Sequence, residues 1–283
     1  MSTFAINKYI IFLPILSICI IFFLFNTEVG RDLFDQFPDN FYLAEFFKKT
    51  ASMASKDNSV QEVTPIEVLR DITLTDLKDN STFKASNIWQ SGPALIFVVR
   101  RPGCQLCRED AVRISSQRDL IFGKMGLNMV AIVHEILDNE VEEFNEGFWK
   151  GTVYFDKEKA FYNSLGGGKL QYAGFVSFIK PSVWSNIRRN YKTGVTGNFK
   201  GDGSVLGGLY IIKSDTEGVV YQYREKVWGD QAPLKQVLKA CEQASPRKGD
   251  TSIQSDIQAA LEKAKSETLL LKNPEACTSE ICG

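Results

Sequence analysis

Hydrophobic side chains occur along this chain in short runs separated by polar turns. The clearest run, Ala94–Val99, is apolar at every position and rich in β-branched residues. Such a run predicts a strand buried on both faces, as in the middle of an α/β sheet. Pro102 and Gly103 break the run, and a helical pattern of apolar and charged positions extends from Arg108 to Phe122. The pattern therefore predicts a buried strand that leads directly into a helix.

Similar segments continue on both sides of this unit. A hairpin is predicted before it, strands and helices alternate after it, and a strand pair and a helix close the domain. These segments are Asp71–Leu77, Phe83–Ile88, Leu127–Val133, Val141–Trp149, Thr152–Phe155, Lys157–Leu165, Leu209–Ile212, Val219–Tyr223 and Asp230–Ala244. Strands that alternate with helices predict a mainly parallel sheet with helices on both faces. The last two strands are predicted to be antiparallel, and Cys241 to be a core residue of the closing helix.

Two cysteines, Cys104 and Cys107, lie where the buried strand passes into the helix. Unpaired amides at a helix N-terminus, together with the helix dipole, favour a thiolate there. Arg100, Arg101 and Arg108 add positive charge, and such a setting typically lowers the pKa of a cysteine below its free value of about 8.5. The spacing brings the cysteines within one helical turn, so the pair can close a disulfide. A Cys-x-x-Cys that opens a helix after a strand is a thioredoxin-type redox signature.

The element order and this signature together predict the fold class. We expect an α/β, thioredoxin-like fold with a central mixed sheet flanked by helices. The stretch Gly166–Gly203 does not fit a minimal version of that fold, so we interpret it as an insertion before the last two strands. Its glycines are interpreted as turns, because their spacing does not match a dinucleotide-binding loop.

Other interpretations of the cysteines stay open. Cys104 and Cys107 could be inert core thiols, although Pro-Gly and arginine neighbours make a poor core. They could also form a zinc site with Cys277 and Cys282, which lie beyond a polar linker. The two tail cysteines could instead be exposed thiols, a lipidation site, or an internal electron shuttle that exchanges with the Cys104–Cys107 disulfide.

Composition excludes several function classes. Charged residues make up 24% of the chain and the formal net charge is −1, so there is no electrostatic footprint for nucleic acid. Six cysteines in 283 residues are too few for a disulfide scaffold. A zinc protease, a Ser-His-Asp hydrolase or a facial-triad iron enzyme would have to be built around the one histidine, His134. We interpret His134 as a strand-end residue, and thiol chemistry as the class that needs no histidine.

The N-terminal segment Tyr9–Phe25 carries no charge and is almost wholly apolar. Its length is at the short end of what spans a bilayer, and it lacks a small-x-small cleavage site, so we predict an uncleaved membrane anchor within residues 1–30. The positive-inside rule favours an external or lumenal domain, in which case Asn80 would be a glycosylation acceptor. The side of the membrane stays undetermined by the sequence.

These features divide the chain into four predicted regions. They are the anchor in 1–30, an amphipathic segment and linker in 31–61, the redox domain in 62–244, and a linker, helix and cysteine-containing tail in 245–283. In the last region, Ser245–Gly249 predicts a mobile linker. Apolar residues at helical spacing from Ile253 to Leu271 predict a helix after it.

Three stretches resemble one known family. FVVRRPGCQLCRED, GNFKGDGSVLGGLYI and YREKVWGD are similar to the peroxiredoxin-like 2 family of thioredoxin-fold redox proteins, nearest its 2A branch. The resemblance covers roughly Glu62–Ala244. It implies an antioxidant or redox-regulatory role carried by Cys104 and Cys107, with no bound cofactor and an external dithiol from the thioredoxin or glutathione system as reductant. It also implies a cytoplasmic domain.

The sequence departs from better-known relatives of that fold. Peroxiredoxins offer a hydroxyl in a Pro-x-x-x-Thr/Ser-x-x-Cys loop, whereas Arg100–Gly103 precedes the first cysteine here. Thioredoxins place a cis-proline opposite the pair, where Gly207–Gly208 lies in this chain. Both absences argue against efficient peroxidase and general disulfide-reductase activity.

We therefore expect a membrane-anchored thiol oxidoreductase or weak peroxidase with an antioxidant role. Cys104, the position expected to be less buried, attacks an oxidised small molecule or a protein disulfide, and Cys107 resolves the product. The reversed roles stay open, because Cys107-Arg108-Glu109 partly resembles the sequence after a peroxidatic cysteine. A thiol reductant and, through residues 9–25, the membrane are the other expected partners. The alternatives are an endoperoxide reductase like the prostamide/prostaglandin F synthases of the sister branch, a non-catalytic redox sensor, and a zinc-binding interaction module.

Overall fold

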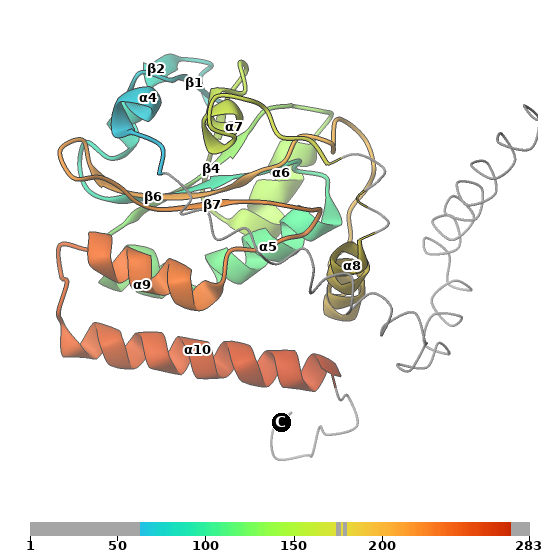
Figure 1. Ribbon diagram of the computed structural model, residues 1–283. Helices are drawn as coiled ribbons and strands as arrows, with labels where there is room; N and C mark the ends of the chain where they lie inside the picture. The colour runs from blue at the N-terminus through green and yellow to red at the C-terminus, as the bar shows by residue number, and fades with distance from the viewer. Residues whose placement is uncertain (1–62, 174–176, 178–179, 273–283) are drawn as a thin grey trace, which may run out of the picture. The chain divides into compact units, whose positions relative to one another are not determined.

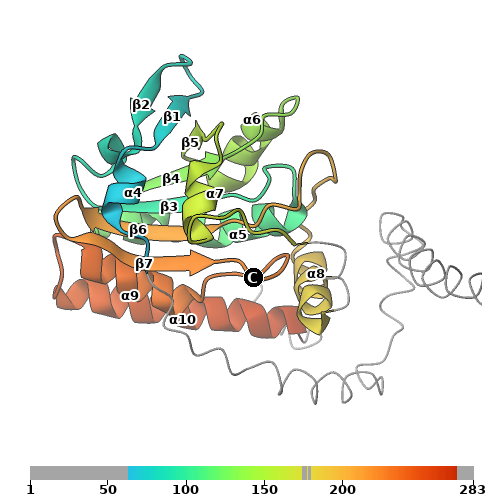
Figure 2. The same cartoon turned by 45° about the horizontal axis from the view of Figure 1, so that its top comes forward.

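The computed structural model describes residues 63–173, 177 and 180–272. Within these residues, one mixed sheet has the strand order β2-β1-β5-β4-β3-β6-β7, as Figures 1 and 2 show. Its strands are β1 Thr73–Asp76, β2 Thr82–Lys84, β3 Ala94–Val98, β4 Asn128–Val133, β5 Thr152–Phe155, β6 Gly208–Ser214 and β7 Gly218–Arg224. Strand β3 runs parallel to β4 and antiparallel to β6, with Ile96 opposite both Val130 and Tyr210. The predicted mixed sheet is confirmed, but the expectation that it is mainly parallel is wrong: among the described strands only β3-β4 and β4-β5 pair in parallel, because the N-terminal hairpin and the last two strands join the sheet antiparallel.

Helices cover both faces of this sheet. The α-helices are α4 Ile66–Arg70, α5 Gln105–Ser115, α6 Glu140–Phe144, α7 Ala160–Leu165, α8 Pro181–Thr193, α9 Leu234–Ala244 and α10 Thr251–Lys272. Three shorter helical segments are η1 Ala85–Ile88, of 3₁₀ type, and η2 Asp119–Lys124 and η3 Asn145–Trp149, of π type. In Figure 1, α5 and α9 lie on one face with α10 outside α9, and α4 and α7 lie on the other.

The core is divided by the sheet into two apolar clusters. Strand β3 is buried at each of its five positions and contributes to both. Leu95 and Phe97 face α5 and α9, whereas Ala94, Ile96 and Val98 face α4 and α7. Burying one such Leu or Ile contributes about 2–3 kcal/mol relative to exposure. The central strand predicted from the sequence is therefore fixed by apolar packing on both sides.

The helix after the cysteines ends earlier than its pattern predicts. The prediction extends to Phe122, but α5 ends at Ser115 and the π-helical η2 follows as a separate segment. Ser115 Oγ donates to the carbonyl of Phe148 at 2.8 Å, and Ser116 Oγ donates to the carbonyl of Arg113 at 2.8 Å. Such side-chain bonds compete with the helical ladder, so two consecutive serines give a physical reason for the early end.

The C-terminal region also differs from its prediction. Helix α10 confirms the helical spacing from Ile253, but the expected mobile linker before it is held against the domain at Ser245. Ser245 is 2% exposed, and its Oγ donates to the carbonyl of Met125 at 2.7 Å. Ile253 of α10 is also buried, in the cluster that contains α5 and α9. Ser245 is therefore packed against the domain, whereas residues 246–249 of the predicted linker are exposed and their mobility stays a prediction.

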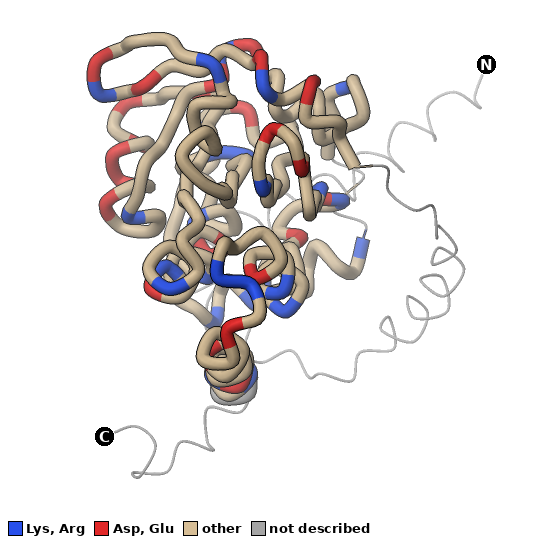
Figure 3. The backbone as a smooth tube through the Cα atoms, turned by 90° about the vertical axis from the view of Figure 1, so that its left-hand side faces the viewer, with Lys and Arg blue, Asp and Glu red and all other residues tan. Residues whose placement is uncertain are grey.

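Among the described residues, no helix is both long and apolar enough to cross a bilayer. The anchor predicted at Tyr9–Phe25 lies outside the described residues, as do the tail cysteines Cys277 and Cys282. Figure 3 shows basic and acidic positions interspersed along the described backbone on the side it presents.

Candidate thiol redox site

Cys104 lies at the start of the helix that follows the central strand. It is the N-cap residue of α5, with extended dihedrals of φ −75° and ψ 124°. Its carbonyl accepts hydrogen bonds from the backbone N–H of Cys107 at 3.1 Å and of Arg108 at 2.9 Å. The sulfur is thereby placed beside the first amides of the helix, which have no helical acceptor. Both Cys104 and Cys107 are free thiols.

The environment of Cys104 favours its thiolate. The thiol of Cys107 donates a hydrogen bond to it, and this bond lowers the pKa of Cys104 well below its usual value. Arg100 acts in the same direction through its charge, because its Nη2 donates to Cys104 Sγ at 2.9 Å. Burial alone would lower the pKa of Arg100, but the charge of Cys104 raises it, so the guanidinium stays charged. The two groups form a buried ion pair when Cys104 is ionised.

Cys107 has the opposite character. Burial raises its pKa well above the usual value, and the hydrogen bond that it donates to Cys104 raises it further. Cys104 is the less buried cysteine, as expected, but only by a small margin, since Cys104 is 6% and Cys107 4% exposed. Charge and hydrogen bonding, rather than exposure, therefore distinguish the two thiols. One is set up as the thiolate and the other as the protonated thiol.

The three arginines predicted to favour the thiolate are not equivalent. Arg100 contacts the sulfur, and the charge of Arg101 also lowers the pKa of Cys104. Arg108 instead donates through Nε to the carbonyl of Pro102 at 2.9 Å and forms an ion pair with Glu143 at 3.0 Å. These contacts with Pro102 and Glu143 hold the Arg108 side chain and account for the difference. The structure does not bring the Arg108 guanidinium to the sulfur.

A buried acid missed by the sequence analysis completes the site. Glu225 follows β7, and its Oε2 lies 3.7 Å from Arg100 Nε and accepts the backbone N–H of Gly207 at 2.8 Å. Burial raises the pKa of Glu225 to about 7, although the charge of Arg100 opposes this rise. Arg100 therefore lies between two acidic groups, the Cys104 thiol and the Glu225 carboxyl.

A small cavity of about 10 Å³ adjoins the second thiol. Its polar lining is formed by Arg100, Cys107, Asp110, Tyr223, Glu225 and Asp230. This volume holds about one water molecule, and a polar lining of this kind gives such a molecule several hydrogen-bonding partners. The cavity is lined by Cys107 and not by Cys104, and it has no room for a large substrate.

The other cysteines and the histidine lie apart from this chemistry. Cys241 is fully buried in α9, which confirms it as a core residue. His134 directly follows β4, as expected, and its Nε2 lies 2.9 Å from the carbonyl of Arg100, so it supports the strand end. Within the ranges that the structure describes, no group of three or more His, Cys, Asp or Glu side chains is arranged to hold a metal ion. The four-cysteine zinc alternative requires Cys277 and Cys282, outside those ranges.

Comparison with known proteins finds relatives over much of the described domain. Residues 114–227 match a family described as AhpC/TSA antioxidant enzyme, a match that begins after the cysteine pair. Peroxiredoxin-like 2A of Homo sapiens is 37% identical over 183 residues, which is 64% of this chain and 77% of that protein. Peroxiredoxin-like 2A of Bos taurus is 37% identical over 187 residues, which is 66% of this chain and 83% of that protein. Among solved structures, the peroxidoxin BcpB of Mycobacterium tuberculosis matches 65% of this chain and 97% of its own, with 11% identity and a TM-score of 0.42.

The sheet, its two helical layers and the matches to the antioxidant-enzyme family and to the peroxiredoxin-like 2A proteins define the class, a thioredoxin-like α/β protein of the peroxiredoxin type. Within that class, the chain belongs to the peroxiredoxin-like 2 family.

Proposed function

We propose that this protein is a thiol-dependent antioxidant oxidoreductase in which Cys104 is the nucleophile and Cys107 the resolving thiol. The observation that carries the proposal is the 2.9 Å contact between Arg100 Nη2 and Cys104 Sγ in a buried site. A buried thiolate needs a charge partner, and a thiolate with such a partner is the nucleophilic form of cysteine. The opposite pKa directions of the two thiols support the same assignment of roles.

With a hydroperoxide as the oxidant, each step balances. The Cys104 thiolate attacks one peroxide oxygen and the O–O bond breaks, which gives a sulfenic acid and hydroxide or alkoxide that takes up a proton. The Cys107 thiol then attacks that sulfur, so that a disulfide forms and water leaves. An external dithiol reduces the disulfide by exchange and is itself oxidised to a disulfide. Arg100 stabilises the thiolate before the first step.

A turnover experiment with the full chain tests this proposal. We expect stoichiometric oxidation of the Cys104–Cys107 pair by hydrogen peroxide, followed by repeated cycles when a thioredoxin or glutathione system is added. In Cys107→Ser the sulfenic acid should form and persist, and in Cys104→Ser it should not form. If wild-type Cys104 stays reduced in peroxide, or if Cys107 is the residue trapped as sulfenic acid, the assignment is incorrect.

A non-catalytic redox sensor is the second candidate function. The low exposure of both thiols favours it, because a sensor needs to be oxidised only occasionally and needs no fast access for substrate. One cycle of oxidation without turnover in the experiment above would identify the sensor. An endoperoxide reductase has less support, since the cavity beside the pair holds about one water molecule.

The N-terminal anchor and the tail remain separate proposals. If Tyr9–Phe25 spans a membrane, the full chain should stay in the membrane pellet at alkaline pH, and a variant lacking residues 1–30 should be released. If Cys277 and Cys282 form a shuttle, recycling of the core disulfide should slow in the double serine variant. Unchanged pelleting or unchanged recycling would reject the respective proposal.

A further inference from the structure

Part of the insertion between α7 and β6 lies directly on the backbone of the Cys-x-x-Cys motif. We call residues 194–203 the cover segment. The backbone N–H of Asn198 donates to the carbonyl of Gly103 at 2.7 Å, and the Arg101 guanidinium donates to the carbonyl of Asn198. The cover segment therefore contacts the residue that immediately precedes Cys104, and one of the arginines beside the thiolate holds it there.

The fit between the cover segment and the motif leaves no room for a side chain. A Cβ atom at Gly197 would lie 2.6 Å from the carbonyl oxygen of Gly103 and 2.7 Å from Cα of Gln105. Both neighbours are backbone atoms at or next to the start of α5, so they cannot rotate away as a side chain could. This close approach agrees with the low exposure of Cys104, which is 6%.

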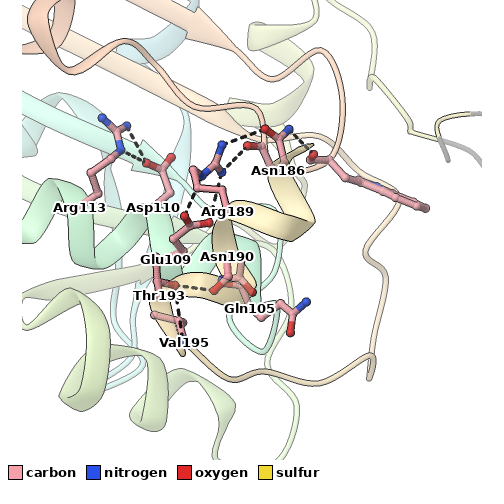
Figure 4. Close-up of polar contacts among 11 residues, drawn as sticks. Gln105, Glu109, Asp110, Arg113, Asn186, Arg189, Asn190, Thr193 and Val195 are labelled. Carbon is pink, nitrogen blue, oxygen red and sulfur yellow. Dashed lines mark hydrogen bonds and ion pairs between the residues drawn. The ribbon is translucent and has the colours of Figure 1, made fainter. Parts of the chain in front are cut away.

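Helix α8, which leads into the cover segment, is attached to the helix that carries the pair (Figure 4). Arg189 donates to both carboxylate oxygens of Glu109, at 2.8 and 3.2 Å. Asn190 donates through Nδ2 to the carbonyl of Gln105 at 3.1 Å. Bidentate pairs of this kind fix geometry as well as adding energy. The cover segment is therefore held at its start by α8 and along its length by Asn198.

Access to the pair therefore depends on the size of the reactant. In disulfide exchange the thiolate must reach a sulfur of its partner directly, which requires a protein disulfide to dock on exposed surface at Cys104. The cover segment contacts the residues on either side of Cys104, Gly103 and Gln105, and Cys104 itself is only 6% exposed. A hydrogen peroxide molecule is close to water in size and needs no docking surface. The cavity lined by Cys107 and by Arg100, the residue that donates to Cys104 Sγ, has room for about one water molecule.

We propose that the cover segment makes the cysteine pair selective for small oxidants over protein disulfides. Exchange with any protein, whether a disulfide substrate or a protein dithiol reductant, then requires displacement of residues 194–203 from Gly103 and Gln105, whereas a small thiol such as glutathione does not need it. The inference rests on the proposed function, because it presupposes that Cys104 is the attacking group. It adds the substrate class and names the element that sets it.

The test compares three oxidants on the full chain. They are hydrogen peroxide, hydroxyethyl disulfide as a small disulfide, and insulin as a protein disulfide, with modification of Cys104 followed by mass spectrometry. Wild type should react with insulin at least about 100-fold more slowly than with the small disulfide. Gly197→Ala should speed the insulin reaction about tenfold by forcing the cover segment off the motif, and change the peroxide rate less than about threefold. Gly123→Ala, the same change where a Cβ meets nothing within 4 Å, is the matched control.

Arg189→Gln provides a second variant in case Gly197→Ala does not fold. It removes the charge pair with Glu109 and should shift the insulin reaction in the same direction. The proposal is overturned if wild type reacts with insulin as fast as with hydroxyethyl disulfide, or if neither variant speeds the insulin reaction. Failure of wild-type Cys104 to react with peroxide would count against the proposed function instead.

Discussion

Two buried cysteines in the same apolar cluster have opposite environments. Cys104 at the start of α5 and Cys241 within α9 are both buried, and both belong to the cluster on the α5 face of the sheet. The pKa of Cys104 is lowered by the Cys107 thiol and by Arg100, whereas burial raises the pKa of Cys241. Low exposure therefore does not identify an inert thiol. The partners that are buried with it decide its reactivity.

The difference originates in where each cysteine lies along its helix. An N-cap position offers unpaired amides and loop residues such as Arg100, while a position within a helix offers packed side chains and amides already bonded to carbonyls. Near Cys104, at the start of α5, the polar side chains of Arg100 and Glu225 are both largely buried. The following variants test whether these groups cause the contrast.

The largest expected effect comes from removing the thiolate itself. Cys104→Ser should slow peroxide consumption by about 1000-fold at neutral pH, because the remaining described thiols have raised pKa values and each unit costs about tenfold in thiolate. Stopped-flow measurement of peroxide loss checks this. A Cys104→Ser variant that retains a tenth of the wild-type rate would show that another thiol carries the reaction.

Glu225→Gln should change how stability depends on pH. The folded-state pKa of Glu225 is raised to about 7, so the folded protein binds this proton more tightly than the unfolded chain, whose value is about 4.3. Wild type should therefore lose roughly 2–3 kcal/mol of unfolding free energy relative to Glu225→Gln as pH rises from about 4 to about 7. Urea unfolding of both proteins across this window measures the difference. Parallel stability curves would show that Glu225 is not the titrating group.

Arg100→Met should raise the pKa of Cys104 by at least about one unit, which lowers the thiolate fraction about tenfold below that pKa. The matched variant is Arg108→Met, because the Arg108 guanidinium contacts Pro102 and Glu143 rather than the sulfur. Thiolate absorbance against pH should shift in the first variant and stay near wild type in the second. Equal shifts in both variants would show that Arg108 stabilises the Cys104 thiolate as much as Arg100 does, as the sequence alone predicts.

The sequence predicts those features that depend on local pattern. The run Ala94–Val99 and the segment Thr152–Phe155 are strands in the structure, and the cysteine pair lies at the strand–helix junction. Contacts between distant segments were not predictable in the same way. Glu225 reaches Arg100 only through the order β3-β6-β7, and the pairing of β6 with β7 contains register shifts near Ile212. An extra residue in one strand changes which side chains face each other, so spacing alone does not specify this contact.

The cover segment illustrates the same limit. Its glycines look like ordinary turn residues in the sequence, and nothing local shows that Gly197 will pack on Gly103. Similarly, Arg108 is adjacent to Cys107 in the chain, but its ion-pair partner Glu143 comes from the distant helix α6. Tertiary packing determines these partners. Sequence reasoning located the cysteine pair at the strand–helix junction but not the distant groups that contact it.

The smallest effect is expected at Cys241, and it tests the other half of the contrast. Cys241→Ala removes one buried sulfur from the α9 face and should cost about 1 kcal/mol of unfolding free energy, as for the loss of one buried methyl-sized group. Cys241→Ser should cost more, about 1–3 kcal/mol, because it buries a hydroxyl where the neighbours are apolar. Neither variant should change the rate of peroxide consumption or the pKa of Cys104. Urea unfolding measures the two changes in unfolding free energy. Stopped-flow kinetics measures the rate of peroxide consumption, and thiolate absorbance against pH measures the pKa of Cys104. A slower peroxide reaction in Cys241→Ala would mean that this thiol takes part in the chemistry. Burial without a charge partner would then not be enough to make a thiol unreactive in this protein.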